Sequence, residues 1–253
     1  MKPENRRYQI LSMLRAIQRE MKVEELADMM NVSPLTIRRD LDQLAVEKTI
    51  IRTHGGCLSV GRAALETEYH KKVGRNFDLK QSIGSAAADI VEDGDVLLLN
   101  DGTTTFHLAT QLAGRKDLTI YTNSLALISE ISRNNHIKLY IIGGEYNNEN
   151  YSLRGSLLEQ TLEGFTFDKV FLGADAIDAE GKCMVGSVEE ARLTKIMLKS
   201  GRKRILLADH TKTEGIGRCA YGSLEDFDLW ITTSGLDPDL QSAFASLVKL
   251  SIT

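Results

Sequence analysis

The 253-residue sequence predicts a two-domain α/β protein, in which a small helical N-terminal domain precedes a larger domain built on a parallel β-sheet. Three observations predict this organisation. The chain is longer than a typical single domain of about 150 residues. Its first sixty residues show helical periodicity and have a charge balance of their own. Beyond residue 79, short β-rich apolar runs alternate with helical patterns, which is typical of parallel sheets.

Composition excludes several classes of protein. Hydrophobic residues make up 42% and charged residues 26%, which is ordinary globular usage and argues against disorder. Apolar runs such as Val96–Leu99 are far shorter than the roughly 18 residues of a membrane span. The N-terminus lacks a signal segment, and the three cysteines form neither a disulfide framework nor a zinc spacing. We therefore expect a cytoplasmic protein with no membrane partner, metal or other cofactor.

The charge is divided unevenly between the two predicted domains. Residues 1–60 contain ten Lys or Arg against eight Asp or Glu, whereas the other 193 residues contain 21 against 27. A modestly basic domain therefore precedes an acidic one. This arrangement suits a small DNA-binding module better than a free-standing enzyme domain.

The N-terminal domain shows three helical patterns, over residues 6–19, 23–31 and 34–47. Ser33 offers a hydroxyl as N-cap to the third helix, and Pro34 suits its first position. Asn31 tolerates the left-handed conformation that ends the second. The buried stripes are Ile10, Met13, Leu14 and Ile17, then Val23, Leu26, Ala27 and Met30, then Ile37, Leu41 and Leu44.

The opposite face of the third helix has the chemistry of a major-groove reader. Arginine pairs with guanine, glutamine with adenine, and methyl groups contact thymine, while a helix N-terminus binds phosphate. Two helices joined by a short turn follow the helix-turn-helix plan. A plain three-helix scaffold with solvated arginines explains the periodicity equally well, and Arg38 or Arg39 can instead pair with Asp40 or Asp42. The candidate DNA-contacting residues are Ser33, Leu35, Thr36, Arg38, Arg39 and Gln43.

A β-hairpin is predicted after the third helix. Residues 50–53 and 57–60 read as strands, with His54-Gly55-Gly56 as the turn between them. A hairpin attached to a helix-turn-helix makes a winged helix, whose wing lies along the DNA backbone or minor groove. Arg52 and His54 would then be DNA contacts.

The run Val32–Leu41 (V-S-P-L-T-I-R-R-D-L), followed by R-T-H-G-G at 52–56, resembles the signature of the DeoR-type family of bacterial transcription regulators. The resemblance implies that residues 1–60 form a winged helix-turn-helix domain that binds double-stranded operator DNA. The charged stretch 61–78, which shows little periodicity, is expected to be a linker.

Residues 79–253 are expected to form the parallel-sheet α/β domain. Predicted strands lie at 96–99, 118–122, 137–142, 169–173, 204–208 and 228–233, and predicted helices at 106–112, 125–133, 157–162 and 189–200. In such sheets ligands bind beyond the carboxyl ends of the strands, so the loops at these ends are the candidate site.

The loop at 100–105 reads as a phosphate cradle. Gly102 lets the backbone approach an anion, the threonine hydroxyls donate, and the following helix N-terminus carries partial positive charge. Alternatively, the threonines only cap the helix. Asp101 repels phosphate and is better assigned to sugar hydroxyls. The candidate effector-binding residues are Asp101, Gly102, Thr103, Thr104, Thr105, Asn123, Gly143, Gly144, Asp175 and Lys212.

These loops together resemble the effector-binding domain of the same DeoR-type family, which is similar to ribose-5-phosphate isomerase; the resemblance implies a phosphorylated sugar as ligand. The isomerases place a lysine before a glycine run and a glutamate base in the next helix. Residues 182–187 hold no glycine run, and neither Glu190 nor Thr194 is equated with that base. We therefore expect sensing and no catalysis.

These observations predict a repressor of a sugar-catabolic operon that is controlled by a phosphorylated sugar. Because winged-helix regulators pair their DNA-binding domains over adjacent half-sites, we expect a dimer or tetramer assembled through the larger domain. Two alternatives stay open. One is a sugar-phosphate isomerase that carries a DNA-binding domain, and the other is a DNA-binding protein that responds to no ligand.

Overall fold

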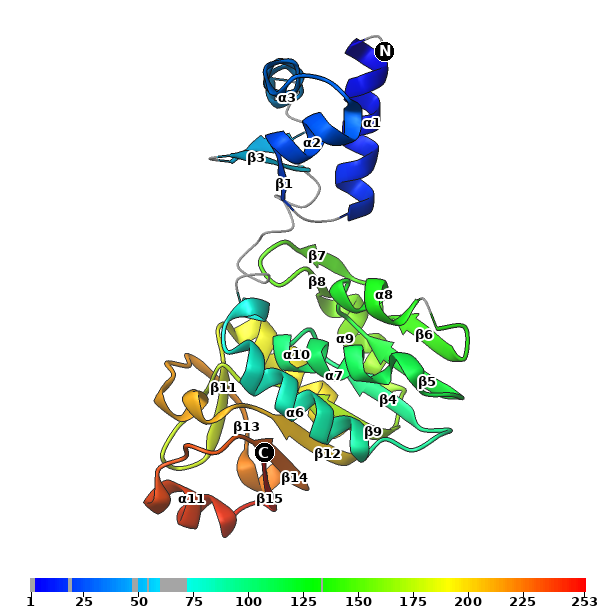
Figure 1. The fold of residues 1–253 in the computed structure, drawn as a ribbon. Coiled ribbons are helices and arrows are strands. Elements are labelled where there is room, and N and C mark those ends of the chain that lie inside the picture. The colour runs from blue at the N-terminus through cyan, green and yellow to red at the C-terminus, as the bar shows by residue number, and fades with distance from the viewer. Residues whose placement is uncertain (1–2, 18–19, 47–49, 54, 60–71, 133) are drawn as a thin grey trace. The chain divides into compact units, whose positions relative to one another are not determined.

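The structure, a computed structural model, divides into two compact units: the head, Met1–His70, and the body, Lys71–Thr253 (Figure 1). Each is described by itself. The division falls inside the connector expected at 61–78, and residues 77 and 78 of that connector already belong to a helix of the body. The structure describes residues 3–17, 20–46, 50–53, 55–59, 72–132 and 134–253.

The head contains the three predicted helices, α1 (Pro3–Ile17), α2 (Val23–Met30) and α3 (Pro34–Val46). Asn31 ends α2 in the left-handed conformation, with φ 51°, and its N–H bonds to carbonyls of the last turn. The apolar stripes of the three helices meet in one core, whose fully buried members include Ile10, Leu26, Ile37 and Leu41. The buried faces predicted from helical periodicity are therefore confirmed, except that Met13 is only partly buried and the side chain of Ile17 lies outside the described residues.

The head also contains a small antiparallel sheet, in the strand order β1-β3-β2. Its strands are β1 (Met21–Lys22), β2 (Ile50–Arg52) and β3 (Gly56–Ser59), and β1 was not predicted. Gly56, expected in the turn, lies in β3, where a Cβ would stand 2.1 Å from the Met21 carbonyl oxygen. This close approach between strands requires glycine at position 56.

The body is built on seven parallel strands in the order β15-β14-β12-β9-β4-β5-β6 (Figure 1). Six of them match predicted strands. The seventh, β15, is only three residues long and gave no apolar run to recognise. The strands are β4 (Val96–Leu99), β5 (Leu118–Thr122), β6 (Ile137–Ile141), β9 (Phe167–Leu172), β12 (Gly201–Leu207), β14 (Leu229–Thr232) and β15 (Leu250–Ile252).

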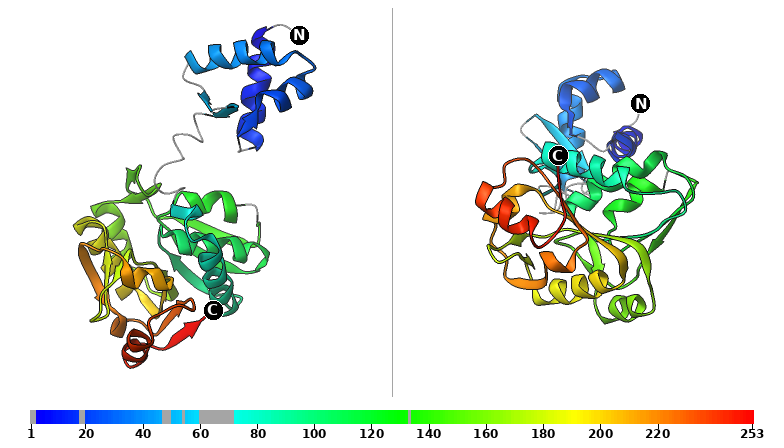
Figure 2. Two further views of the ribbon diagram at one scale, coloured as in Figure 1. Left: turned by 60° about the vertical axis from the view of Figure 1, so that its left-hand side comes forward. Right: turned by 90° about the horizontal axis from the view of Figure 1, so that it is seen from below.

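Helices cover both faces of this sheet (Figure 2). Helices α6 (Phe77–Asp89), α7 (Thr103–Gln111) and α8 (Ala126–Ile131) enclose one core with Leu97 and Leu99. Helices α9 (Ser156–Glu163), α10 (Val188–Lys199) and α11 (Pro238–Ala245) enclose the other with Leu98 and Trp230. The body is thus a three-layer domain, as the alternation of strand and helix patterns predicted.

Helix α6 was missed because the face that it buries is not conventionally apolar. That face consists of Lys80, Ile83, Gly84, Ala87 and Ala88. A Cβ on Gly84 would stand 2.7 Å from the His107 carbonyl carbon, so the glycine lets α6 and α7 pack closely. This packing brings the first turns of the two helices together.

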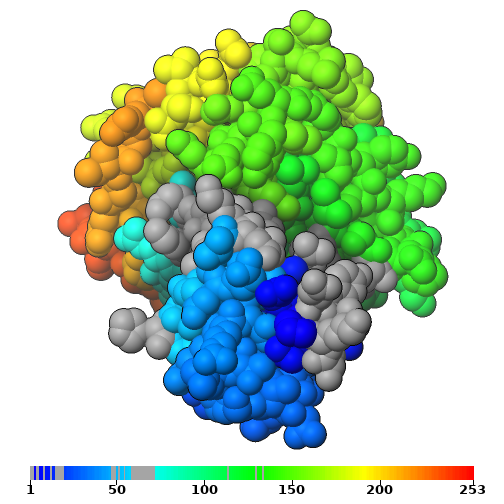
Figure 3. All heavy atoms as spheres, turned by 90° about the horizontal axis from the view of Figure 1, so that it is seen from above, coloured from blue at the N-terminus to red at the C-terminus, as the bar shows by residue number. Residues whose placement is uncertain are grey.

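Smaller elements surround the sheet. β7 (Glu145–Asn147) and β8 (Ser152–Arg154) form a hairpin, and β10 (Ala176–Ile177), β11 (Lys182–Val185) and β13 (Cys219–Ser223) form an antiparallel sheet. Arg154 of β8 pairs with Glu189 of α10 at 3.2 Å. Correspondingly, the green hairpin region and the yellow α10 region are neighbours at the surface in Figure 3. Three 3-10 helices are η1 (Leu112–Gly114), η2 (His210–Glu214) and η3 (Leu224–Asp226).

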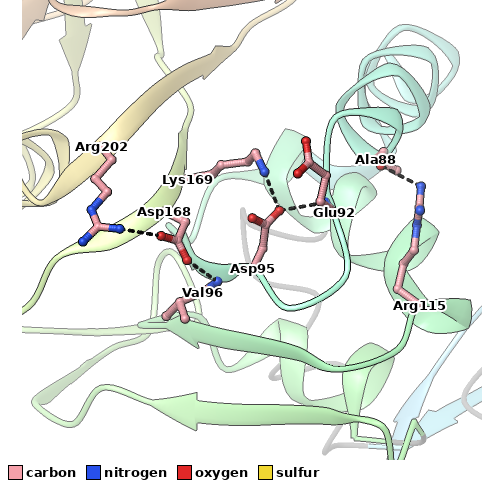
Figure 4. A network of polar contacts seen from close by, with 8 residues as sticks. All are labelled: Ala88, Glu92, Asp95, Val96, Arg115, Asp168, Lys169 and Arg202. Carbon is pink, nitrogen blue, oxygen red and sulfur yellow. Dashed lines mark hydrogen bonds and ion pairs between the residues drawn. The ribbon is translucent and has the colours of Figure 1, made fainter.

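The amino ends of the central strands carry a network of paired charges (Figure 4). The Lys169 ammonium lies 2.5 Å from the Asp95 carboxylate, and both side chains are nearly buried. Asp168 accepts from the Val96 N–H at 3.0 Å and pairs with Arg202 at 3.1 Å. Two of the acidic side chains of this network, Asp95 and Asp168, therefore each have a cation as partner.

In the part of the chain that the structure describes, no helix combines the length and the apolar character needed to cross a bilayer.

Candidate functional sites

The polar face of α3 is exposed on the head. Ser33, Leu35, Arg38, Arg39 and Gln43 lie at the surface. Leu35 is 57% exposed, which is unusual for a large apolar side chain and leaves its methyl groups free to contact another surface. The helix thus presents one face with guanidinium, amide and methyl groups, which is the set that reads base edges in a major groove.

The N-terminus of α3 has the cap that the sequence predicted. The Ser33 hydroxyl accepts the Thr36 N–H at 3.2 Å, and its oxygen also lies 2.9 Å from the Thr36 hydroxyl, which is half-buried. These two residues therefore shape the start of the helix, and any contact that they make with phosphate is made from the capped conformation.

One alternative was that Arg38 or Arg39 pairs with Asp40 or Asp42. The structure gives both acidic residues other partners. Asp40 points inward and pairs with Arg6 of α1 at 2.5 Å, both being nearly buried. Asp42 lies 3.3 Å from Arg52 of β2, and Arg38 is 3.8 Å from Glu24 of α2, where both side chains are exposed. An exposed pair of this length contributes little, so it restrains Arg38 weakly.

The wing residues are only partly described. Arg52 is half-buried, and its Nη1 atom has no hydrogen-bond partner among the described residues. His54, the other predicted wing contact, lies outside the described residues.

In the body, the loop at 100–105 connects β4 to α7 and is shaped by its own hydrogen bonds. The Thr105 hydroxyl is buried and lies 2.8 Å from the Asn100 carbonyl and 2.5 Å from the Gly102 carbonyl. Gly102 occupies a tight position, where a Cβ would stand 3.0 Å from Asn100 Oδ1. We therefore assign Thr105 to shaping the loop. Gly102, at the N-cap of α7, has no side chain to cap the helix, and its first turn stays open.

Acidic groups gather beside this loop. Asp175 Oδ2 and Glu190 Oε2 each lie 3.7 Å from the position of a Cβ on Gly186, so the two carboxylates converge. Burial, together with the charges of Asp101 and Asp175, raises the pKa of Glu190 to about 7. Burial also raises the pKa of Asp101, against the hydrogen bonds from Ser152 and Asn123 that lower it. These groups can accept hydrogen bonds from hydroxyls.

Basic groups gather on the other side. Lys80 of α6 is only 4% exposed, and its ammonium donates to the Lys72 carbonyl oxygen. Among the described residues, no carboxylate lies within ion-pair distance of it. Burial, together with the charges of Lys212, Arg75 and Lys72 and against the opposing charge of Asp209, lowers the pKa of Lys80 to about 8. A buried ammonium among other cations favours an anion.

Several buried side-chain oxygens at this edge have no hydrogen-bond partner among the described residues, and two of them belong to strand-end loops of the candidate site. They are Oδ1 of Asn123 and Oδ2 of Asp209, whose side chains are 1% and 0% exposed. Asn123 donates through Nδ2 to the Leu153 carbonyl at 3.0 Å, and the other oxygen of Asp209 accepts from Thr211 at 2.5 Å. Buried acceptors without donors are uncommon in native proteins, and both follow strands of the parallel sheet.

The two glycines at 143–144 have a structural part. A Cβ on Gly144 would stand 2.4 Å from the Arg154 carbonyl oxygen, so this residue lets the chain pass close to β8. The hairpin β7–β8 in turn carries Ser152, which hydrogen-bonds Asp101. Gly144 therefore acts on the site indirectly, by allowing the close packing against the hairpin that carries Ser152. Gly143 is exposed.

Sequence reasoning missed four residues of this edge: Lys80, Ser152, Glu190 and Asp209. Lys80 carried a usable signal, because it lies at i, i+3 and i+7 with Ile83 and Ala87, on the buried face of its helix. A lysine is rarely buried on such a face unless it has a partner. Asp209 also carried a signal, because it directly follows the strand predicted at 204–208. Ser152 and Glu190 had none of their own, because only the fold brings their segments to the same edge. Among the described residues, no group of His, Cys, Asp and Glu has an arrangement that could hold a metal ion.

Comparison with known families matches both units of the chain. Residues 6–62 match the DeoR-like helix-turn-helix domain, and residues 75–234 match the DeoR C terminal sensor domain. Among solved structures, ribose 5-phosphate isomerase A from Methanocaldococcus jannaschii is similar over 55% of each chain, with 20% identity and a TM-score of 0.41.

Curated relatives are similar over nearly the full length. The transcriptional repressor AccR of Agrobacterium fabrum is 32% identical over 92% of this chain and 90% of its own. The HTH-type transcriptional regulator GlpR of Haloferax volcanii is 34% identical over 88% of each chain. With a DNA-binding domain and a sensor domain in this order, the chain belongs to the DeoR family of transcription regulators.

Proposed function

We propose that this protein is a repressor of a sugar-catabolic operon, and that a phosphorylated sugar bound at the carboxyl edge of the body sheet sets its affinity for operator DNA. One observation carries the proposal. The loops and helix ends at this edge bring together the buried ammonium of Lys80, the N-terminus of α7 and a set of carboxyl groups, which are Asp101, Asp175 and Glu190. An anionic group and a set of hydroxyls would each meet suitable partners there.

The phosphate is assigned to the basic side. Lys80 and Lys212 supply positive charge, and the backbone N–H groups of Thr103 and Thr104 supply donors at the start of α7. A helix N-terminus and ammonium groups are the usual partners of phosphate in proteins. Gly102 has no side chain to stand between its backbone and the anion.

The hydroxyls are assigned to the acidic side. Asp101 and Asp175 accept hydrogen bonds, and the buried oxygens of Asn123 and Asp209 would gain donors that the described residues do not supply. An acceptor that is already buried gains most from a new donor, because its desolvation has occurred in folding. A polyol that carries one phosphate therefore fits both sides.

Control of transcription requires that the sugar phosphate favour one arrangement of the protein over another. A ligand that binds both arrangements equally shifts nothing, so the effector must prefer the one in which paired heads fit the operator poorly. We assign this pairing to a homodimer or tetramer held together by the body, with α3 of each head in a major groove.

Isothermal titration with a panel of aldose and ketose phosphates, and with the same sugars unphosphorylated, tests the ligand. We expect heat only from phosphorylated sugars. Lys212→Ala and Gly102→Val should remove the binding and keep operator affinity, which a gel-shift with DNA from upstream of the protein's own gene reports. Silence from every sugar phosphate would favour a regulator that responds to no ligand, and a normal response of both variants would contradict the site.

Alanine substitution in α3 tests the DNA contacts. We expect Arg38→Ala and Arg39→Ala each to weaken operator binding by about 1–3 kcal/mol if the side chain reads a base. If it contacts phosphate, the loss should be similar on every DNA sequence. The control is Arg7→Ala, which removes a half-buried arginine of α1 and leaves α3 unchanged. Unchanged binding by both α3 variants would contradict α3 as the recognition helix.

A second function, isomerisation of the sugar phosphate, is favoured by one observation. Glu190 has a pKa of about 7 and converges with Asp175 beside Gly186, and such a carboxyl can both take and return a proton near neutral pH. A coupled assay of aldose-to-ketose conversion tests it, with Glu190→Gln as the variant. Turnover by the wild type that this variant loses would support the isomerase, and no turnover would leave sensing.

A further inference from the structure

The first described residues of the body, 72–76, lie across the basic side of the candidate ligand site. This segment, here called the strap, follows the stretch that leads from the head. Three contacts hold it, and each comes from a different element that borders the site. Its position therefore depends on the residues to which the effector is assigned.

The first two contacts are made to backbone carbonyls of the strap. The Lys80 ammonium, from α6, donates to the Lys72 carbonyl oxygen. His107 of α7 has its Nε2 atom 3.3 Å from the Val73 carbonyl oxygen. Because a carbonyl only accepts, Nε2 must carry the proton. Both donors are nearly buried, so the strap covers polar groups that would otherwise lack a partner.

The third contact is made by a side chain of the strap. Asn76 Nδ2 donates to the Thr211 hydroxyl at 3.1 Å, and this hydroxyl donates to Asp209 at 2.5 Å. Asn76 has φ 56°, in the left-handed region, and is the N-cap residue of α6. The strap is thus tied to η2, the element that carries Lys212.

The strap adds positive charge to a region that already holds two ammonium groups. The charges of Arg75 and Lys72, both on the strap, act together with Lys212 and with burial to lower the pKa of Lys80 to about 8. Repulsion among these four cations opposes the three hydrogen bonds, and it is offset in part by Asp209, whose charge acts on Lys80, and by Asp101 and Glu190, on which the charge of Lys72 acts. An anion placed among the cations would reverse the sign of that interaction.

We infer that a bound phosphate group fastens the strap to the body and so fixes the point at which the chain enters the body from the head. The inference rests on the proposed function and adds the route by which the bound effector reaches the head. Without an anion, the strap is held by hydrogen bonds against cationic repulsion. With one, Arg75 gains an opposite charge, Lys72 gains one in addition to the carboxyl groups of Asp101 and Glu190, and the strap becomes harder to open.

Hydrogen–deuterium exchange of the full chain tests the strap directly. The probes are inorganic phosphate and D-ribose 5-phosphate, each compared with sodium chloride at equal ionic strength. We expect slower exchange at 103–107, where the anion binds, and slower exchange at 72–76, where the strap closes. Protection at 103–107 with unchanged or faster exchange at 72–76 would overturn the strap and leave the ligand site standing. No protection at either segment with either probe would overturn both proposals.

A variant separates the strap from the anion site. Asn76→Gly removes the amide that reaches Thr211 but keeps a residue that adopts positive φ readily. We expect it to bind inorganic phosphate about two- to tenfold more weakly, as the loss of one neutral hydrogen bond implies, and to lose protection at 72–76. Arg115→Gln is the matched control, because it removes a 2.9 Å hydrogen bond to Ala88 at the opposite end of α6. Equal phosphate affinity of Asn76→Gly and wild type would contradict the strap.

Discussion

The two ends of the body sheet treat buried charge in opposite ways. At the amino end, Lys169 and Asp95 are nearly buried and lie 2.5 Å apart, and Asp168 has Arg202 (Figure 4). At the carboxyl end, Lys80 is buried near three cations and Asp209, and Glu190 is buried near Asp101, Asp175 and Lys72, but neither forms an ion pair with a described residue. Charges that are satisfied within the fold stabilise it. Charges that are held beside charges of their own sign are candidates for binding a ligand, and this difference supports the proposed ligand site.

The difference also separates two lysines that composition alone cannot distinguish. Both are nearly buried, at 7% exposure for Lys169 and 4% for Lys80. One faces a carboxylate and the other a backbone carbonyl. If the comparison is right, replacing Lys169 should lower stability, and replacing Lys80 should weaken ligand binding.

The largest expected effect is on stability at the amino end. Lys169→Met leaves the Asp95 carboxylate buried without its cation, and we expect the free energy of unfolding to fall by about 3 kcal/mol. Urea unfolding followed by the fluorescence of Trp230, the single tryptophan, measures the body alone. Phosphate binding should remain. A loss below about 1 kcal/mol would show that this pair is not a structural one.

The matched substitution at the carboxyl end should leave stability intact and weaken ligand binding. Lys80→Met removes an ammonium group whose charged form burial disfavours, so the unfolding free energy should be unchanged or higher. Sugar-phosphate affinity should fall roughly a hundredfold, near the upper end for a hydrogen bond to a charged group. Calorimetric titration measures it. Strong destabilisation with intact binding would make the two ends alike and refute the comparison.

The pH dependence of binding should follow the two shifted groups. Between pH 7 and pH 9, Lys80, with a pKa of about 8, loses its positive charge, while Glu190, with a pKa of about 7, gains its negative charge. Both changes disfavour an anion, and the phosphate itself stays doubly charged in this range. We expect the affinity to fall at least tenfold. The affinity of the Glu190→Gln variant should fall less steeply over this pH range. An affinity that rises with pH would contradict the assignment.

The smallest effect is expected for an exposed member of the amino-end network. Arg202 pairs with Asp168 at 3.1 Å, but its side chain is 73% exposed. Solvent and salt screen such a pair, so Arg202→Ala should change the unfolding free energy by less than about 0.5 kcal/mol and leave phosphate affinity unchanged. A larger loss would show that the network acts as a unit rather than through its buried pair.

Prediction from the sequence succeeded where a property repeats along the chain. The stripes Ile37-Leu41-Leu44 and the apolar runs at 96–99 and 118–122 recur with the period of the element that they form, so their buried faces followed directly. It failed where burial does not follow polarity. In α6 the buried face includes Lys80 and Gly84, and the residues that precede it were taken as connector.

The candidate site was predicted in part for the same reason. Loops at the ends of parallel strands can be read from the strand pattern, so Asp101, Gly102, Asn123, Asp175 and Lys212 were proposed before the structure. Glu190 and Ser152 follow no strand of the main sheet, and only the packing of α10 and of the β7–β8 hairpin brings them to its edge. The pairing of Asp40 with Arg6 was missed likewise, because 34 residues separate them.

The sequence by itself therefore determined the order of the two domains, the recognition helix pattern, the strands of the sheet and the family, because each depends on residues close together in the chain. The tertiary structure decided which charges are paired and which are not, because that depends on burial and on distances between segments far apart. Lys169 and Lys80 have the same side chain, and only the groups that the fold places around each one make the first structural and the second available to a ligand.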